Sequence, residues 1–368
     1  MGFESGAVSV RMVELPRPFP KNWLERFAAH KAGLLETMDV EKQSGWVTGR
    51  HLLDTHLTEE SAQYAGWIRL TWREAKRKVP AALLKAECKM EELARMAAEG
   101  KTHLKPKIRS EIKESVRDRL LPNMPPQLKA IPFVYRPGSH HLYVGALNDT
   151  SLDTFRGALR ESVEMTGTPA FPADLGQRLK NIDLMDFPGA SFSREMADVA
   201  MEATPGRDFL TWLWFKAEAQ NGRVVLGTGQ TVDVLIEGPL TFAYEGNGAF
   251  ETVLRKGLPE MSAEARTSLL AGKKLRRATL HFALDAAAEW RFQLDADTFV
   301  VKSLKLPKSE GPLDAVSRFQ ERMIFLDQWR DIFYDLFGTF TELRATPKKW
   351  KAELEALRAW VENRPSRR

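Results

Sequence analysis

Apolar and polar residues in the first part of the chain follow a period of two and then a period of three to four. Residues 64–72 alternate in the manner of a strand with one buried face. From Pro80 onward the apolar residues recur at helical spacing, and Gly100 stands where the C-terminal cap of that helix belongs. We expect the inward face of this helix to consist of Leu83, Ala86, Met90, Leu93 and Ala97.

A second helix is predicted directly after the first. Pro106 suits its first turn, apolar residues follow at every fourth position from Ile108 to Leu120, and Pro122 ends the run. The two helices form an antiparallel pair whose basic residues lie mostly off the apolar stripe. The next predicted elements are strands at 131–136 and 141–146 and a helix at 153–164.

The second half of the chain predicts another antiparallel sheet. Its four expected strands are 223–226, 231–236, 278–284 and 289–294. Residues 250–270, between the second and third of these strands, form a projecting arm with a short helix that begins at Ser262. Residues 167–193 lack a clear period and predict an irregular connection.

Two further segments are strongly apolar. The run 209–215 has too few polar residues for a surface and must be buried, as a helix or as a strand. Residues 314–361 predict helix, with breaks near Gly338 and Pro347. Strands that pack with helices in this order indicate an α+β fold of antiparallel sheets and packed helices. We expect three regions, at 1–166, 167–310 and 311–368.

Composition narrows the class of protein. The chain has 368 residues, of which 43% are hydrophobic and 28% charged, as in folded globular proteins. No window approaches 18 uncharged apolar residues, and residues 1–13 lack the pattern of a signal peptide, so we expect a cytoplasmic protein without a membrane partner. The single cysteine, Cys88, excludes an internal disulfide and a Cys-rich zinc site. We expect no cofactor and no metal.

Basic residues are concentrated in part of the chain. The net charge is +5, yet residues 69–119 hold 15 Lys and Arg against 8 acidic residues. A protein that holds DNA without reading bases needs many cations spread over one face. The candidate phosphate contacts form four clusters: Arg73, Lys76, Arg77 and Lys78; Lys101, Lys105, Lys107 and Arg109; Arg255 and Lys256; and Lys273, Lys274, Arg276 and Arg277.

Two other classes of function remain open. Asp285, Asp295 and Asp297 could hold magnesium in a nuclease, although a turn between two strands is the favoured interpretation of these residues. Alternatively, the aromatic run 209–215 and the C-terminal helices could bind a protein partner, and the basic residues would then be a solvated face.

The order of several segments resembles the recombination-associated RdgC family. The segments that carry the resemblance, over residues 40–305, are Gly45-Trp46-Val47, Arg119-Leu120-Leu121-Pro122, Leu142-Tyr143-Val144-Gly145, Ala158-Leu159-Arg160-Glu161-Ser162, Ser262-Ala263-Glu264, Leu270-Ala271-Gly272-Lys273-Lys274, Leu280 to Leu284, Arg291-Phe292-Gln293-Leu294 and Val301-Lys302-Ser303-Leu304-Lys305.

The resemblance implies a non-enzymatic, nucleoid-associated bacterial protein that binds DNA with little sequence preference. It also implies a homodimer closed into a ring around duplex DNA, which limits the access of a RecA-type recombinase by occupying the DNA; single-strand binding stays open. Leu128 takes the place of a Phe that forms part of a ring interface in the family. Gly257-Leu258 replace a basic residue and Gln of the family's arm, and the positive charge lies just upstream, at Arg255 and Lys256.

Overall fold

The computed structural model describes residues 2–38, 41–244, 250–284, 288–308, 311 and 314–364. The chain divides into two compact units that interleave along the sequence. The sheet unit comprises Met1–Arg17, Ser139–Asp149 and Gly167–Arg368, and the hairpin unit comprises Pro18–Gly138 and Thr150–Thr166. A division by residue order, as in the expected regions 1–166, 167–310 and 311–368, does not capture this interleaving, because the first strand pairs with a strand almost 300 residues later.

The hairpin unit is built on an antiparallel sheet of β2 (Lys42–Thr48), β4 (Trp67–Lys76) and β5 (Gln127–Tyr135), with the short β3 (Gln63–Tyr64) beside β4. The helices α1 (Trp23–Ala29), α2 (Glu59–Ala62) and α5 (Asp149–Val163) complete it. Helix α1 is short and ends at Ala29.

An aromatic cluster forms the core of the hairpin unit. The Trp46 ring lies 4.9 Å from Phe27, 5.5 Å from Phe133 and 6.0 Å from Phe155, which brings α1, β5 and α5 onto β2. The indole Nε1 of Trp46 donates to Ser162 Oγ of the α5 segment at 2.7 Å, so this buried polar group is satisfied. Residues far apart in sequence therefore fix the sheet from which the basic helices extend.

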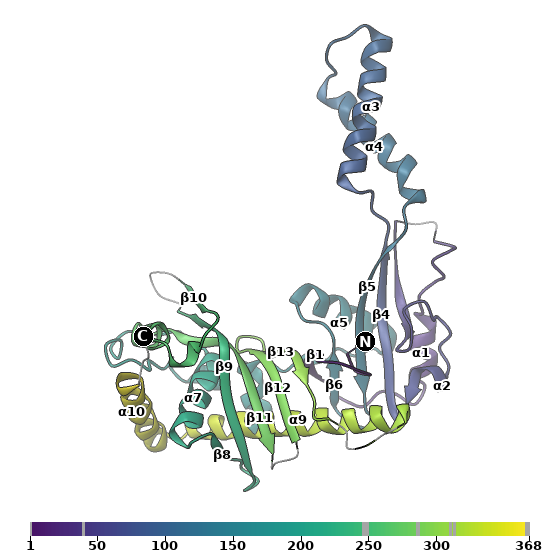
Figure 1. Cartoon of the computed structure of the whole chain (residues 1–368). Coiled ribbons are helices and arrows are strands. Elements are labelled where there is room, and N and C mark those ends of the chain that lie inside the picture. Colours follow the sequence, from purple (N-terminus) through teal and green to yellow (C-terminus); the bar gives the residue numbers. More distant parts are fainter. Residues whose placement is uncertain are drawn as a thin grey trace. The chain divides into compact units, whose positions relative to one another are not determined.

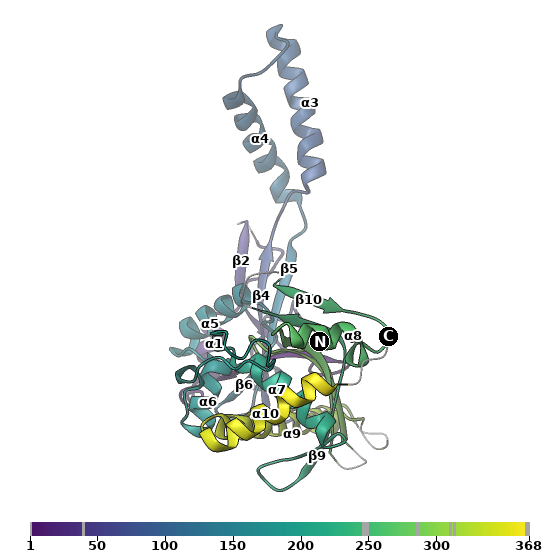
Figure 2. The ribbon, with the colours of Figure 1, turned by 90° about the vertical axis from the view of Figure 1, so that its left-hand side faces the viewer.

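The basic helical pair extends from the ends of β4 and β5, as Figures 1 and 2 show. Helix α3 (Ala81–Glu99) ends at Gly100, which has φ 61°, and α4 (Pro106–Leu120) starts with Pro106 and continues into the 3-10 turn η1 (Leu121–Asn123). Both helices, the cap and the proline are confirmed. We call the segment 81–123 the helical hairpin.

The predicted inward face of α3 is wrong. The seam between the helices consists of Leu104, Ile112 and Val116, flanked by Leu84 and Cys88 among others. By contrast, the predicted inward residues Leu83, Met90 and Leu93 are 36%, 64% and 51% exposed. Helix α3 carries two apolar stripes on different faces, both with helical spacing, and spacing within one helix does not show which stripe meets α4.

The sheet unit contains a large antiparallel sheet in the order β10-β9-β11-β12-β13-β1-β6, with β7 beside β1 and β8 beside β9. Its strands are β1 (Val8–Glu14), β6 (His141–Val144), β7 (Thr168–Pro169), β8 (Arg223–Val225), β9 (Thr231–Ala243), β10 (Glu251–Leu254), β11 (Lys274–Leu284), β12 (Ala288–Asp295) and β13 (Val300–Lys305). The four expected strands of the second half are present, and the α+β class with antiparallel sheets is confirmed.

Helices cover the sheet unit. They are α6 (Pro172–Lys180), α7 (Pro205–Ala219), α8 (Ala263–Leu270), α9 (Ala315–Arg344) and α10 (Pro347–Asn363), with 3-10 turns η2 (Leu184–Asp186) and η3 (Pro259–Met261). Helix α9 lies along one face of the sheet, where Trp290 Nε1 donates to Phe325 O at 3.0 Å and the Phe292 and Trp329 rings are 5.3 Å apart.

Three expectations for these helices are settled. The run 209–215 is a helix, part of α7, and the Phe209 ring lies 5.1 Å from that of Phe337 on α9. The expected break at Gly338 is wrong: α9 continues through it, and the missing side chain leaves room for Lys180 of α6. The segment 167–193 is also more regular than expected, because it contains α6.

Candidate nucleic-acid interface

The second predicted cluster lies at the turn between α3 and α4. The Lys101 ammonium is 2.8 Å from Glu99, while Lys105, Lys107 and Arg109 are exposed and their side chains have no ion pair or hydrogen bond among the described residues. These three residues occupy the N-cap and the first turn of α4, and the first turn holds no acidic residue. Because the helix dipole disfavours cations at an N-terminus, helix stability does not account for their position.

The first cluster, at the base of the helical hairpin, divides by burial. Arg73 is 1% exposed, and its guanidinium donates to Leu52 O at 3.1 Å and Gln43 Oε1 at 3.2 Å, as well as to Gly33 O. Burial lowers the pKa of Arg73 from its ordinary value, which marks an enclosed cation. Arg73 therefore holds two loops against the sheet, and in this structure a phosphate cannot reach it.

The other members of this cluster lie near the junction of strand and helix. Lys76 is 3.4 Å from Glu41, and Arg77 donates to Pro122 O at the end of the helical hairpin. Lys78 is exposed and its side chain has no partner among the described residues. Arg77 thus positions the helical hairpin on β4, and Lys78 remains accessible.

Leu128 lies on β5 opposite Ala75 and is half-buried. It lines a groove of about 820 Å³ together with Arg77, Lys78 and Leu121. A leucine in the wall of a groove offers apolar area to a partner, and its role in a dimer interface stays a prediction.

The third cluster lies on the arm. Arg255 and Lys256 are exposed in the turn after β10, and positive φ angles of 67° at Lys256 and 69° at Gly257 turn the chain sharply. Ser262 caps α8 as expected, because its Oγ accepts from Ala265 N at 3.1 Å. The arm therefore presents two accessible cations on the sheet unit.

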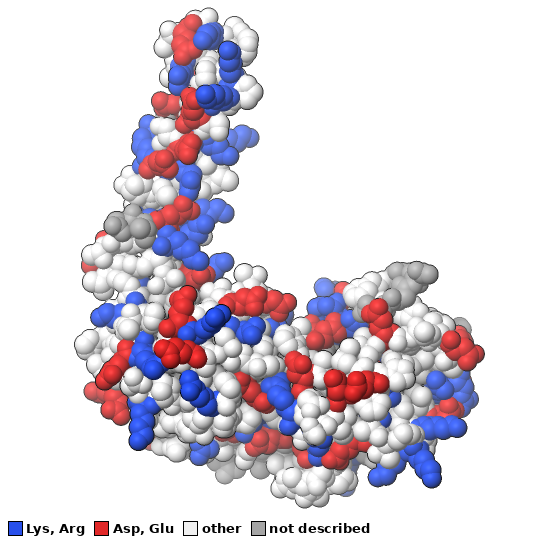
Figure 3. Space-filling view, turned by 180° about the vertical axis from the view of Figure 1, so that it is seen from behind, with Lys and Arg blue, Asp and Glu red and all other residues white. Residues whose placement is uncertain are grey.

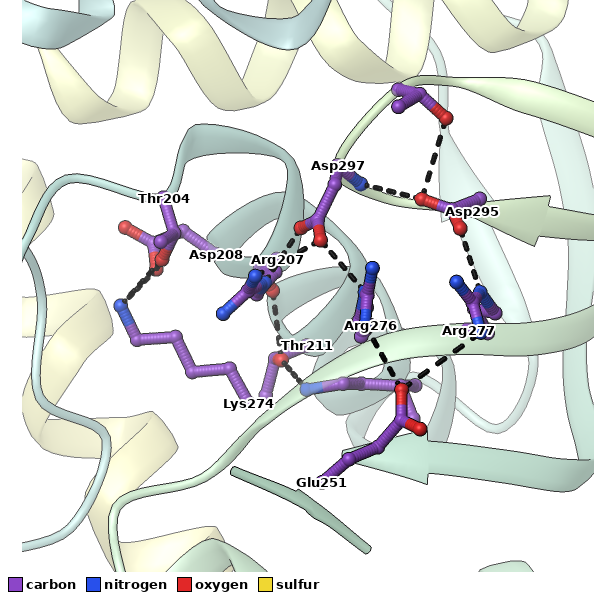
Figure 4. A network of polar contacts seen from close by, with 12 residues as sticks. Thr204, Arg207, Asp208, Thr211, Glu251, Lys274, Arg276, Arg277, Asp295 and Asp297 are labelled. Carbon is purple, nitrogen blue, oxygen red and sulfur yellow. Dashed lines mark hydrogen bonds and ion pairs between the residues drawn. The ribbon is translucent and has the colours of Figure 1, made fainter. Parts of the chain in front are cut away.

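The fourth cluster is mostly engaged within the fold, as Figure 4 shows. Lys274 is 4% exposed, and its Nζ donates to Asp208 Oδ1 at 2.5 Å and to Thr204 Oγ1 at 3.1 Å. The ammonium is thus enclosed by a carboxylate and a hydroxyl. Lys274 is not an accessible phosphate contact in this structure.

Arg276 and Arg277 belong to the same network. Arg276 is 3.0 Å from Glu251 and 2.7 Å from Asp297, and Arg277 is 2.6 Å from Asp295, whose hydrogen bond raises the pKa of Arg277. Lys273 Nζ donates to Thr252 Oγ1 at 2.5 Å. The acidic partners come from β10, from the end of β12 and from the turn after it, so the charges of Arg276 and Arg277 are largely neutralised.

The same contacts occupy two of the candidate nuclease carboxylates. Asp297 accepts both Nε and Nη2 of Arg207, at 2.6 and 2.9 Å, in addition to its ion pair with Arg276. Asp295 also accepts the backbone N–H of Asp297 at 3.1 Å, as in a turn. Asp285 lies outside the described residues. Within the described ranges, no three His, Cys, Asp or Glu side chains are grouped so as to hold a metal ion.

Part of the basic surface lies outside the four predicted clusters. Lys85 and Lys89 on α3 and Lys113 on α4 are exposed, and their side chains have no partner in the part of the chain that the structure describes. The three arginines Arg95, Arg117 and Arg119 are all paired with carboxylates. Lys and Arg side chains accordingly alternate with acidic ones along the helical hairpin in Figure 3. Cations that are neighbours in the sequence form a visible basic run, whereas cations one helical turn apart do not.

Among the described helices, none is long and apolar enough to cross a membrane.

Comparison with known proteins gives one family. A family model with the description "Putative exonuclease, RdgC" matches residues 21–181, which span nearly all of the hairpin unit and its basic helices. The curated proteins contain no match. Over residues 21–181, this match confirms the resemblance to the recombination-associated RdgC family that the sequence predicts.

Proposed function

We propose that this protein binds DNA through the phosphate backbone, without reading the base sequence and without cutting the strand. The observation that carries the proposal is the group Lys105, Lys107 and Arg109 at the start of α4. Their charges are exposed and have no partner among the described residues, at a helix end where cations are unfavourable. A phosphate backbone supplies the negative charge that this position lacks, and contacts of this kind carry no sequence information.

The proposal extends to assembly. A homodimer that closes around the duplex would keep the helical hairpins on the backbone while the protein slides, and bound protein would limit the access of a RecA-type recombinase to the same DNA. The RdgC match over residues 21–181 supports this extension. A closed ring of two chains needs two self-complementary interfaces, and the half-buried Leu128 offers apolar area for one of them.

The family description names an exonuclease, whereas we propose a non-enzymatic protein. The ion pairs of Asp295 and Asp297 with three arginines support this choice, because carboxylates engaged in this way are poor magnesium ligands. Incubation of labelled duplex with the protein and magnesium or manganese tests it. Nicks that disappear in Asp297→Asn would overturn the non-enzymatic part of the proposal.

Fluorescence anisotropy tests DNA binding. Two unrelated duplexes of about 30 base pairs should bind with equal affinity across a salt series, with a steep linear dependence of log K on log salt. In the double variant Lys105→Gln and Lys107→Gln, the slope should fall by about 0.9 for each phosphate that the protein no longer neutralises, equally for both duplexes.

A matched control removes the same charge from a different surface. Lys348→Gln with Lys349→Gln changes two exposed lysines of α10, and we expect an unchanged slope. A loss confined to one duplex sequence, or an equal loss in the control, would contradict the proposal.

A further inference from the structure

A cleft of about 650 Å³ runs between the two helices of the helical hairpin. It is lined by Ala81, Leu84, Lys85, Cys88, Lys89 and Glu92 of α3 and by Arg109, Ser110 and Lys113 of α4. We call it the hairpin cleft. It lies entirely within the hairpin unit, so both of its walls belong to one compact body.

The hairpin cleft concentrates positive charge. Lys85 and Lys89 on one wall and Arg109 and Lys113 on the other are exposed, and none of their side chains has an ion pair or hydrogen bond among the described residues. Glu92 is the one acid among the described residues that line the cleft. Four cations that face one space repel one another, and an anion bound between them would relieve this repulsion.

The arginines of α3 and α4 outside the hairpin cleft lie close to acidic residues. Arg119 is 3.1 Å from Glu87 and 3.8 Å from Glu91, Arg95 is 3.1 Å from Glu99, and Arg117 pairs with Glu41. Outside the cleft, the arginines of α3 and α4 therefore have carboxylate partners. The cations of the cleft remain available to a ligand.

The floor of the cleft is apolar. Leu84 and Cys88 are half-buried and pack against the seam of Leu104, Ile112 and Val116. The ligand must therefore present negative charge along its edges and less polar groups toward the floor. Axes of packed helices are about 8–10 Å apart, which leaves no room for a double helix, whose major groove alone is about 12 Å wide.

We propose that the hairpin cleft binds one sugar–phosphate strand, either a single strand or one backbone of a duplex. This inference rests on the proposed function and specifies which part of the helical hairpin contacts the strand. Phosphates lie between the two walls, where each pair of cations is four residues apart and therefore separated by about 6 Å along its helix. The Ser110 hydroxyl can donate to a phosphate oxygen, and sugars lie over Leu84 and Cys88.

The single cysteine of the chain lies in this cleft, so its reactivity reports occupancy. The rate at which a thiol reagent modifies Cys88 is measured with a strand of about 30 nucleotides, with the matching duplex, and with inorganic tripolyphosphate at the same phosphate concentration. At a DNA concentration about ten times Kd, bound DNA should slow modification roughly tenfold, and high salt should restore the rate. Tripolyphosphate should have less than about a twofold effect.

Two variants control the measurement. In Cys88→Ala with Met90→Cys, the thiol moves to the outer face of α3, where Met90 is 64% exposed, and DNA should leave its reactivity unchanged within about twofold. In Lys89→Gln with Arg109→Gln, protection of Cys88 should disappear, and the salt slope of binding should fall by about 1.8.

The outcomes separate the two proposals. If anisotropy shows bound DNA while Cys88 reacts as fast as in the DNA-free protein, the hairpin cleft is not the binding site. The proposed function would still stand. Equal protection by tripolyphosphate would overturn the assignment to a nucleic acid strand. No DNA binding at low salt would refute the proposed function itself.

Discussion

Lys274 distinguishes a cation that stabilises the fold from one that contacts DNA. Its ammonium and the carboxylate of Asp208 are 4% and 3% exposed and 2.5 Å apart. In Lys274→Met, the Asp208 carboxylate stays buried without its partner, which in comparable cases costs about 3–5 kcal/mol of stability. At about 2–4 °C per kcal/mol for a unit of this size, the thermal transition of the sheet unit should fall by about 6–20 °C.

Thermal unfolding followed by calorimetry measures this change, and anisotropy below the transition measures DNA binding in the same variant. We expect the salt slope of Lys274→Met to equal that of the unchanged chain. The double variant Lys274→Met with Asp208→Leu should recover most of the missing stability, because no buried charge remains. An unchanged transition together with a reduced salt slope would refute the structural role of Lys274.

Three further predictions concern a buried histidine, a buried arginine and the seam of the helical hairpin. Burial and the neighbouring Arg330 lower the pKa of His141, so stability should fall as the pH drops below about 6.5, and His141→Gln should remove this dependence in denaturation at pH 5 and pH 7. Arg73→Ala removes a buried guanidinium and its hydrogen bonds to Leu52 O and Gly33 O and should cost about 1–3 kcal/mol in denaturant titrations, whereas Lys78→Ala should cost less than about 0.5 kcal/mol. Ile112→Ala in the seam should cost about 2–5 kcal/mol, and Met90→Ala on the outer face less than about 0.5 kcal/mol; equal losses would contradict the observed seam.

Local signals in the sequence were sufficient for the helical hairpin. Gly100 and Pro106 act on the backbone of their own turn, and the structure has both helix ends where these residues predict them. The packing face of α3 was not predictable in the same way. Its choice between two apolar stripes depends on Ile112 and Val116 of another helix, which the spacing within α3 does not reveal.

Whether a predicted phosphate contact is accessible also depends on contacts with other elements of the fold. The cations of β11 form a basic run in the sequence, yet their partners are Glu251, Asp295, Asp297 and Asp208, which are between about 20 and 70 residues away. The pairing of strands and the packing of α7 bring these acids to the run, and no pattern within the run itself predicts them. The sequence pattern predicts accessible cations correctly on α4, because no strand among the described residues packs against this helix to supply acidic partners.

Charge and its accessibility are therefore separate properties of this chain. On β11, Lys274, Arg276 and Arg277 already have carboxylate partners, so exchange of a carboxylate for a phosphate would leave that acid without its partner. On the helical hairpin, the lysines that have no ion pair among the described residues have no such acid to release, and binding of a phosphate exchanges hydration and counterions alone. The energetic cost of a phosphate contact is lower on the helical hairpin for this reason, and the interface is expected there rather than where the sequence is most basic.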